Sequence, residues 1–142
     1  MSKRVHKSFP LENHFPERIN FLDLKFDDSG YKVRVFEFAN PGGPIYEINF
    51  GRMPLAQRSM DEGKFLAMTS TSHPDDRQMA PIVLVTGSDL LDWFHEQCCG
   101  MFAKDEVKHV AILTQNEWVE VLYLELPEIR KVIAYFPFVS SI

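Results

Sequence analysis

Alternating apolar and polar positions divide most of this chain into short strands, with one helical segment near its middle. The stretch from Pro81 to Gly100, PIVLVTGSDLLDWFHEQCCG, opens with a β-branched apolar run that is typical of a buried strand. Thr86-Gly87 interrupts this run. Ser88 is then placed to cap a helix, because its hydroxyl can accept a free amide of the first turn.

The helix predicted over about residues 88–99 has two different faces. Spacings of three, four and seven residues form an apolar face from Leu90, Leu91, Phe94 and Cys98. The same spacing aligns an acidic stripe on another side: Asp89, Asp92 and Glu96. We expect Leu91 and Phe94 to be buried and the stripe to be exposed. Gly100 is expected to end the helix in the left-handed conformation.

Strand patterns lie on both sides of this helix. Ile19 to Phe26 and Tyr31 to Phe38 are predicted to pair as a hairpin around the turn Asp27-Asp28-Ser29-Gly30, with a bulge or strong twist in the second strand. Further strands are predicted at residues 45–50, 107–113 and 118–124, with a less regular extended segment in 51–66. Residues 1–16 are expected to form an irregular arm, and the apolar tail 130–142 to dock on the domain or on another subunit.

The pattern as a whole predicts an α+β fold. We expect a single domain over residues 1–142, with a mostly antiparallel sheet of about six to eight strands packed against one main helix. With 45% hydrophobic residues, a chain of 142 residues is long enough to bury a core.

Charge is unevenly distributed along the chain. Residues 1–80 are balanced, whereas residues 81–128 hold nine acidic and two basic residues, and the whole chain carries −5. This asymmetry could steer a basic partner or could be ordinary solvated surface. The acidic balance argues against nucleic-acid binding through phosphate contacts.

The cellular compartment is predicted from three sequence features: the length of the apolar runs, the N-terminus and the cysteines. No apolar run reaches the ~20 residues needed to cross a bilayer, and the basic N-terminus lacks the apolar core of a secretory signal. The two cysteines, Cys98 and Cys99, are adjacent and therefore poorly placed to bridge each other. We expect a cytoplasmic protein with reduced thiols and no membrane partner.

Three groups of residues could carry chemistry, and each has a plainer interpretation. His95 and Cys99 could share a metal ion from one helix face, but zinc needs at least three ligands and no third is near in sequence. Cys99 with His109 could form a nucleophilic pair, although no family signature surrounds either residue. Arg58, Asp61 and Glu62 beside Gly63 could act in acid–base chemistry, but an ion pair closing a turn is the favoured interpretation. We therefore predict no metal, no cofactor and no catalytic residue.

Two blocks of sequence resemble a group of small, largely uncharacterised bacterial α+β proteins. They are IYEINFGRMPLAQRSMDEGKFL, residues 45–66, and SDLLDWFHEQCCGMFAKDEVKHVAILTQNEWVEVLYLELPEI, residues 88–129. The positions that match the group's pattern are Arg58, Asp61, Glu62, Gly63, Ser88, Trp93, Phe94, Lys108, His109, Pro127 and Glu128. Val110 departs from the pattern, which has an aromatic there, and the tail after Ile129 is particular to this chain.

Members of this group resemble immunity proteins encoded beside toxins of contact-dependent inhibition and polymorphic toxin systems. The resemblance implies a protein that binds and neutralises a cognate toxin domain, for instance a nuclease, in the cytosol. On that hypothesis the partner-binding residues are Asp89, Asp92, Glu96, Asp61 and Glu62. The alternative is a small enzyme or ligand-binding domain with a pocket that uses Arg58, Glu62 and His109, and an oligomerising adaptor is a third possibility; the oligomeric state is left open.

Overall fold

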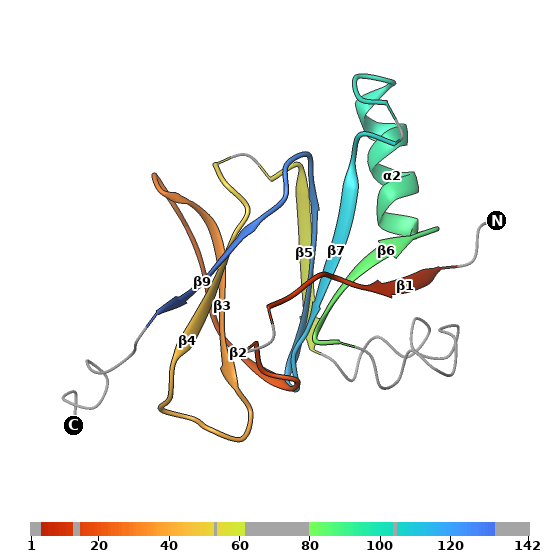
Figure 1. Cartoon of the computed structure of the whole chain (residues 1–142). Coiled ribbons are helices and arrows are strands. Elements are labelled where there is room, and N and C mark those ends of the chain that lie inside the picture. Colours follow the sequence, from red (N-terminus) through yellow and green to blue (C-terminus); the bar gives the residue numbers. More distant parts are fainter. Residues whose placement is uncertain (1–3, 13–14, 53, 62–79, 104, 133–142) are drawn as a thin grey trace.

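Two antiparallel sheets stack face to face in a computed structural model of the chain, which describes residues 4–12, 15–52, 54–61, 80–103 and 105–132 (Figure 1). The five-stranded sheet has the order β1 (Val5–Ser8), β6 (Ile82–Thr86), β7 (Lys108–Leu113), β8 (Glu117–Tyr123) and β5 (Ala56–Asp61). The four-stranded sheet has the order β2 (Ile19–Asp27), β3 (Gly30–Glu37), β4 (Ile45–Asn49) and β9 (Glu128–Val132). Helix α2 (Asp89–Cys98) lies outside the five-stranded sheet, so the molecule has three layers.

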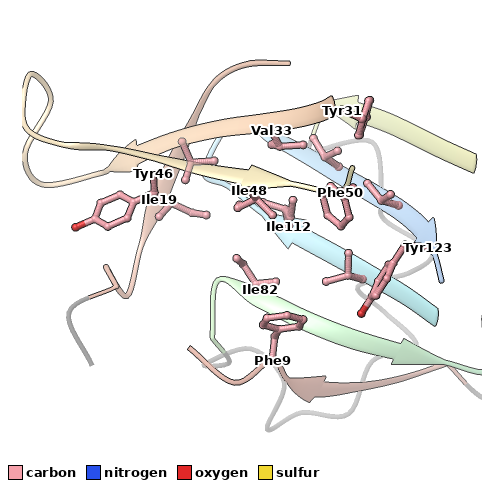
Figure 2. Packing of buried hydrophobic residues seen from close by; sticks show 14 of the residues in the cluster. Phe9, Ile19, Tyr31, Val33, Tyr46, Ile48, Phe50, Ile82, Ile112 and Tyr123 are labelled. Carbon is pink, nitrogen blue, oxygen red and sulfur yellow. The ribbon is translucent and has the colours of Figure 1, made fainter. Parts of the chain in front are cut away.

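The main core fills the space between the two sheets (Figure 2). Val33 and Ile48 from the four-stranded sheet face Ile82 and Ile112 from the five-stranded sheet, and all four are at most 1% exposed. Phe50 extends this contact, with its ring 6.1 Å from that of Tyr31 and 5.8 Å from that of Tyr123. These residues alternate along their strands, as expected when one face of each sheet is buried.

Helix α2 packs over the opposite face of the five-stranded sheet. Leu90 is buried there with Val107 and Leu122, and the half-buried side chains around them are Leu55, Ala56, Leu91, Phe94 and Phe102. Strand β8 is therefore covered on both faces, which explains why apolar residues run through it without clear alternation.

The predicted hairpin, the strand that starts at Ile82 and the helix are confirmed, but the predicted single sheet is two sheets with less helix than expected. The prediction that residues 1–16 form an irregular arm is wrong in part, because Val5–Ser8 is a strand that pairs with β6. The start of the tail 130–142 belongs to β9, which pairs with β4; residues 133–142 lie outside the described part. The irregularity of the hairpin lies in β2, between Phe21 and Asp23, and not in its partner.

The helix itself differs from the prediction in two details. Cys99 is the C-cap of the helix and is left-handed, with φ 51°; Gly100, which was predicted to end the helix, follows it and also has a positive φ, of 83°. Leu91 and Phe94 face the sheet but remain partly exposed, and Leu90 is the buried residue of the helix. The Phe94 ring packs against the cluster around Leu90, and part of it stays exposed to solvent.

The unequal burial of these helix residues can be measured. We expect Leu90→Ala to lower the free energy of unfolding by about 2–5 kcal/mol, because it leaves a cavity in a closed site. Phe94→Ala should cost less, about 1–2 kcal/mol, since part of its ring already faces water. Urea denaturation of both variants tests this order; a larger loss for Phe94→Ala would mean that the helix is seated differently.

Candidate functional site

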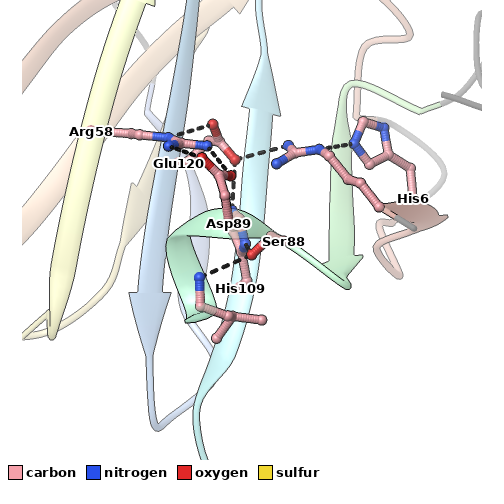
Figure 3. A network of polar contacts seen from close by, with 8 residues as sticks. His6, Arg58, Ser88, Asp89, His109 and Glu120 are labelled. Atoms are coloured by element: carbon pink, nitrogen blue, oxygen red, sulfur yellow. Dashed lines mark hydrogen bonds and ion pairs between the residues drawn. The ribbon is translucent and has the colours of Figure 1, made fainter. Parts of the chain in front are cut away.

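The carboxylate of Glu120 is the centre of a polar network on the face of the five-stranded sheet that α2 covers (Figure 3). Glu120 lies in the middle of β8 and is 0% exposed. Its Oε1 accepts hydrogen bonds from Arg4 Nη2 at 2.8 Å and His109 Nε2 at 2.7 Å, and its Oε2 accepts one from Arg58 Nε at 2.9 Å. A buried carboxylate requires such partners, because an unpaired charge in the interior is costly.

These cationic partners come from opposite edges of the sheet. Arg58 lies in the edge strand β5, directly across from Glu120 in the register. Arg4 immediately precedes the other edge strand, β1, and its Nε also donates to Nε2 of His6 at 2.9 Å. Both arginines therefore reach inward to one carboxylate, which joins β1, β5 and β8 through side chains.

His109 links this carboxylate to the start of the helix. The carboxylate of Glu120 can only accept, so Nε2 of a neutral His109 carries the hydrogen and Nδ1 accepts from the Ser88 hydroxyl at 2.8 Å. Ser88 Oγ in turn accepts the amide of Leu91 at 3.1 Å, as the N-cap of α2. A directed chain of hydrogen bonds thus runs from the helix amide to Glu120.

Asp89 provides a second connection between the helix and the sheet. Both of its carboxylate oxygens accept from the Arg58 guanidinium, at 3.0 and 3.1 Å. This hydrogen bonding lowers the pKa of Asp89 below its ordinary value. Arg58 therefore contacts Glu120 and Asp89 at once, and it fixes the first turn of α2 over β5 and β8.

The protonation states follow from burial and from these contacts. Desolvation lowers the pKa of His109, and the hydrogen bond to Glu120 only partly opposes this effect, so the imidazole is neutral. Burial of Glu120 opposes its ionisation, but the His109 hydrogen bond and the charge of Arg4 outweigh burial and lower its pKa to about 2. Among the described residues of the network, the carboxylates of Glu120 and Asp89 face the guanidinium groups of Arg4 and Arg58.

Serine, histidine and a carboxylate in one hydrogen-bonded row are also the parts of a nucleophilic catalyst. Here the row is closed to solvent, because Ser88 and His109 are each 1% exposed and Glu120 is fully buried. The Ser88 hydroxyl also accepts the Leu91 amide as the cap of α2, so it differs from an accessible nucleophile in being buried and in capping a helix. The arrangement holds α2 on the sheet and presents no nucleophile.

The structure separates the acidic residues that were predicted to bind a partner. Asp89, Asp92 and Glu96 are exposed as expected, but Asp89 is engaged by Arg58. Asp61 is the last residue of β5, and its backbone lies opposite that of Glu117 in β8. Glu62 lies outside the described residues. Arg58 pairs with Asp89 and Glu120, and the predicted turn at residues 61–63 is not among the described features.

The other candidate chemistries are not brought together. Cys99 lies at the far end of α2, about 15 Å by helix geometry from the end where His109 bonds Ser88. Cys98 and Cys99 are free thiols. Among the described residues, no three or more histidine, cysteine, aspartate or glutamate side chains are grouped to hold a metal ion, and no helix in that part of the chain is long and apolar enough to cross a membrane.

A surface cavity of about 300 Å³ lies away from this network, between the segment after β1 and the strands β4 and β9. Its wall is largely apolar and includes Phe9, Leu11, Phe15, Tyr46 and Ile129. Neither Arg58 nor His109 lines it. This cavity is therefore not the pocket of the alternative hypothesis, and Glu62, the third residue of that pocket, lies outside the described part of the chain.

Sequence reasoning missed Glu120, Arg4 and His6 as members of one network. One signal was present, since Glu120 interrupts the apolar strand EWVEVLY and a carboxylate in such a place needs cationic partners. Which arginines supply that charge depends on strand order, and Arg4 is 116 positions away.

Comparison with known proteins adds no relative: no protein-family model, no curated protein and no solved structure matches this chain.

The buried carboxylate should be essential for stability. Glu120→Gln removes the charge that faces Arg4 and Arg58, and we expect it to lower the free energy of unfolding by about 3–5 kcal/mol. Glu125→Gln makes the same change at an exposed position and should stay within about 0.5 kcal/mol of the parent chain. Urea denaturation at neutral pH measures both; equal effects would contradict the role of Glu120.

Stability should also fall on acidification, in two ranges. His109 binds a proton more weakly in the folded than in the unfolded chain, so folding loses stability as pH falls below the ordinary histidine value of 6.5. Glu120 adds a second loss as pH falls from 4.5 toward about 2, which corresponds to about 3 kcal/mol in total.

Urea denaturation at several pH values separates the two ranges. His109→Gln, which cannot titrate, should reduce the change between pH 7.5 and 5 and leave the loss below 4.5 in place. His95→Gln, on the half-buried side of α2, is the matched control and should keep the behaviour of the parent chain. A parent chain whose stability is constant from pH 7.5 to 5 would contradict the buried, neutral state of His109.

Proposed function

We propose that this protein is a binding inhibitor of the immunity type, which neutralises a cognate bacterial toxin domain through the exposed side of α2. The observation that carries the proposal is an acidic helix surface on a helix whose orientation is fixed by buried hydrogen bonds. Asp92 and Glu96 are exposed, and within the described part of the chain neither of them forms an ion pair. The resemblance of residues 45–66 and 88–129 to toxin-neighbouring proteins points to the same class of function.

Such a surface suits a partner with a basic cleft, for instance a nuclease domain that binds phosphate groups. Carboxylates presented on a rigid element accelerate association with a basic surface and discriminate among partners. A helix already held in place loses little conformational entropy on binding, so more of the interaction energy remains as affinity. The action is stoichiometric binding in the cytosol, and it requires no cofactor.

The alternative, a small enzyme or ligand-binding domain, has less support from the geometry. Its proposed residues Arg58 and His109 both bond the carboxylate of Glu120. His109 is closed to solvent, and the described cavity lies elsewhere.

Co-expression with the toxin domains encoded beside this gene tests the proposal. The parent chain should restore growth of toxin-expressing cells and should copurify with one toxin. Asp92→Lys combined with Glu96→Lys should abolish protection and weaken binding at least tenfold, because the reversed charges repel a basic surface. Asp89 is left intact, since a lysine there would repel Arg58 and disturb the fold.

A matched double reversal controls for net charge. Glu17→Lys with Asp28→Lys makes the same change at exposed positions beside β2, on the other sheet, and should keep protection. Binding of the parent chain should also slow as added salt shortens the screening length from about 10 Å at 0.1 M to about 3 Å at 1 M. Failure of every neighbouring toxin to bind, or full protection by the Asp92/Glu96 reversal, would refute the proposed interface.

A further inference from the structure

Trp93 is an exposed aromatic residue on the acidic side of α2. Its side chain is 53% exposed, whereas Trp118, the other tryptophan of the chain, is 7% exposed. Tryptophan is enriched among the residues that contribute most to protein–protein binding, because its large rigid ring loses little entropy on contact. The exposed part of the Trp93 indole is therefore available for contact with a partner.

Helix geometry places the indole among the carboxylates. Trp93 is four residues after Asp89 and three before Glu96, so these side chains are neighbours on one surface of the helix. Asp92 is four residues before Glu96 but consecutive with Trp93, so it lies on the side of Glu96 away from the indole, and Glu96 is the carboxylate between them. Asp89 is neutralised by Arg58, which leaves Asp92 and Glu96 as the charges available to a partner.

The backbone under this surface is fixed at its N-terminal end. Ser88 caps the helix and bonds His109, and Leu90 is buried against the sheet. Asp89 accepts hydrogen bonds from Nη1 and Nη2 of Arg58. The backbone that carries Trp93 and Asp92 therefore lies about one turn from these anchors, and that of Glu96 about two turns.

We propose that Trp93, Asp92 and Glu96 form a receptor for an arginine side chain on the surface of a protein partner. A guanidinium is planar, so it can stack on the indole and still donate paired hydrogen bonds to a carboxylate. An ammonium group is compact and more strongly hydrated, and it can satisfy these contacts less well together. This inference rests on the proposed function in using the same helix, and it adds the chemical identity of the partner's contact residue.

Short peptides test the receptor without any toxin. A fluorescein-labelled all-arginine peptide and an all-lysine peptide of equal length are titrated against the full chain at about 50 mM salt, with anisotropy as the readout. We expect the arginine peptide to bind at least threefold more tightly. Binding should also quench or shift the tryptophan emission of the parent chain, and Trp93→Phe should remove this signal.

Substitutions separate the indole from the charges. Trp93→Ala should weaken the arginine peptide about fivefold and the lysine peptide less, so that the preference disappears, and Trp93→Phe should restore part of it. Asp92→Asn with Glu96→Gln should weaken both peptides about tenfold. Glu17→Gln with Asp28→Asn, the matched control on the other sheet, should change neither. Circular dichroism verifies that each variant is folded.

Two results would overturn the inference: equal binding of both peptides by the parent chain, or an arginine preference that survives Trp93→Ala. The outcomes also distinguish this inference from the proposed function. Peptide binding as expected, with no neighbouring toxin bound, refutes the immunity function and supports the receptor. Full neutralisation of a toxin by Trp93→Ala refutes the receptor and leaves the immunity function standing.

Discussion

A single buried charge organises the outer face of the five-stranded sheet. Glu120 cannot lie inside a protein without cationic partners, and its two carboxylate oxygens are reached by Arg4, Arg58 and His109. Apolar packing between α2 and the sheet would tolerate small rotations and shifts of the helix. Directional hydrogen bonds from His109 through Ser88 to the first helical turn do not tolerate them, so the polar network sets the orientation of the helix.

The same arrangement places residues typical of catalysis out of contact with solvent. A hydroxyl, an imidazole and a carboxylate in a row can activate a nucleophile only where a substrate can reach the hydroxyl. In this fold Ser88 is buried at the N-cap of α2, and the exposed residues of the helix are Asp89, Asp92, Trp93, Glu96 and Gln97. The buried row connects the start of α2 to the sheet, and the proposed binding surface lies on the exposed side of the same helix.

The sequence predicted local structure better than assembly. Alternation identified the hairpin of β2 and β3, and Ser88 identified the start of the helix, because those signals depend on neighbours in the chain. The division into two sheets could not be predicted, since it depends on which strands pair across long separations. β1 was missed because a four-residue strand gains most of its stability from its partner, β6.

The candidate site shows the same division. The exposed stripe of Asp89, Asp92 and Glu96 followed from helical spacing alone. The pairing of Arg58 with Asp89 did not, because it requires β5 and the helix to be adjacent in space. Trp93 was read as part of a family pattern, and its exposure depended on which helix face the sheet covers.

The position of Arg4 has a consequence for how the chain folds. Its contact with Glu120 spans 116 positions, and β1 must pair with β6 before the guanidinium can reach the carboxylate. During synthesis Arg4 therefore leaves the ribosome long before Glu120, and the two can bond only after most of the described chain has emerged. Contacts this distant in sequence slow folding, because a large loop must close before they form. The bond between Arg4 and Glu120 is accordingly expected to form late in folding.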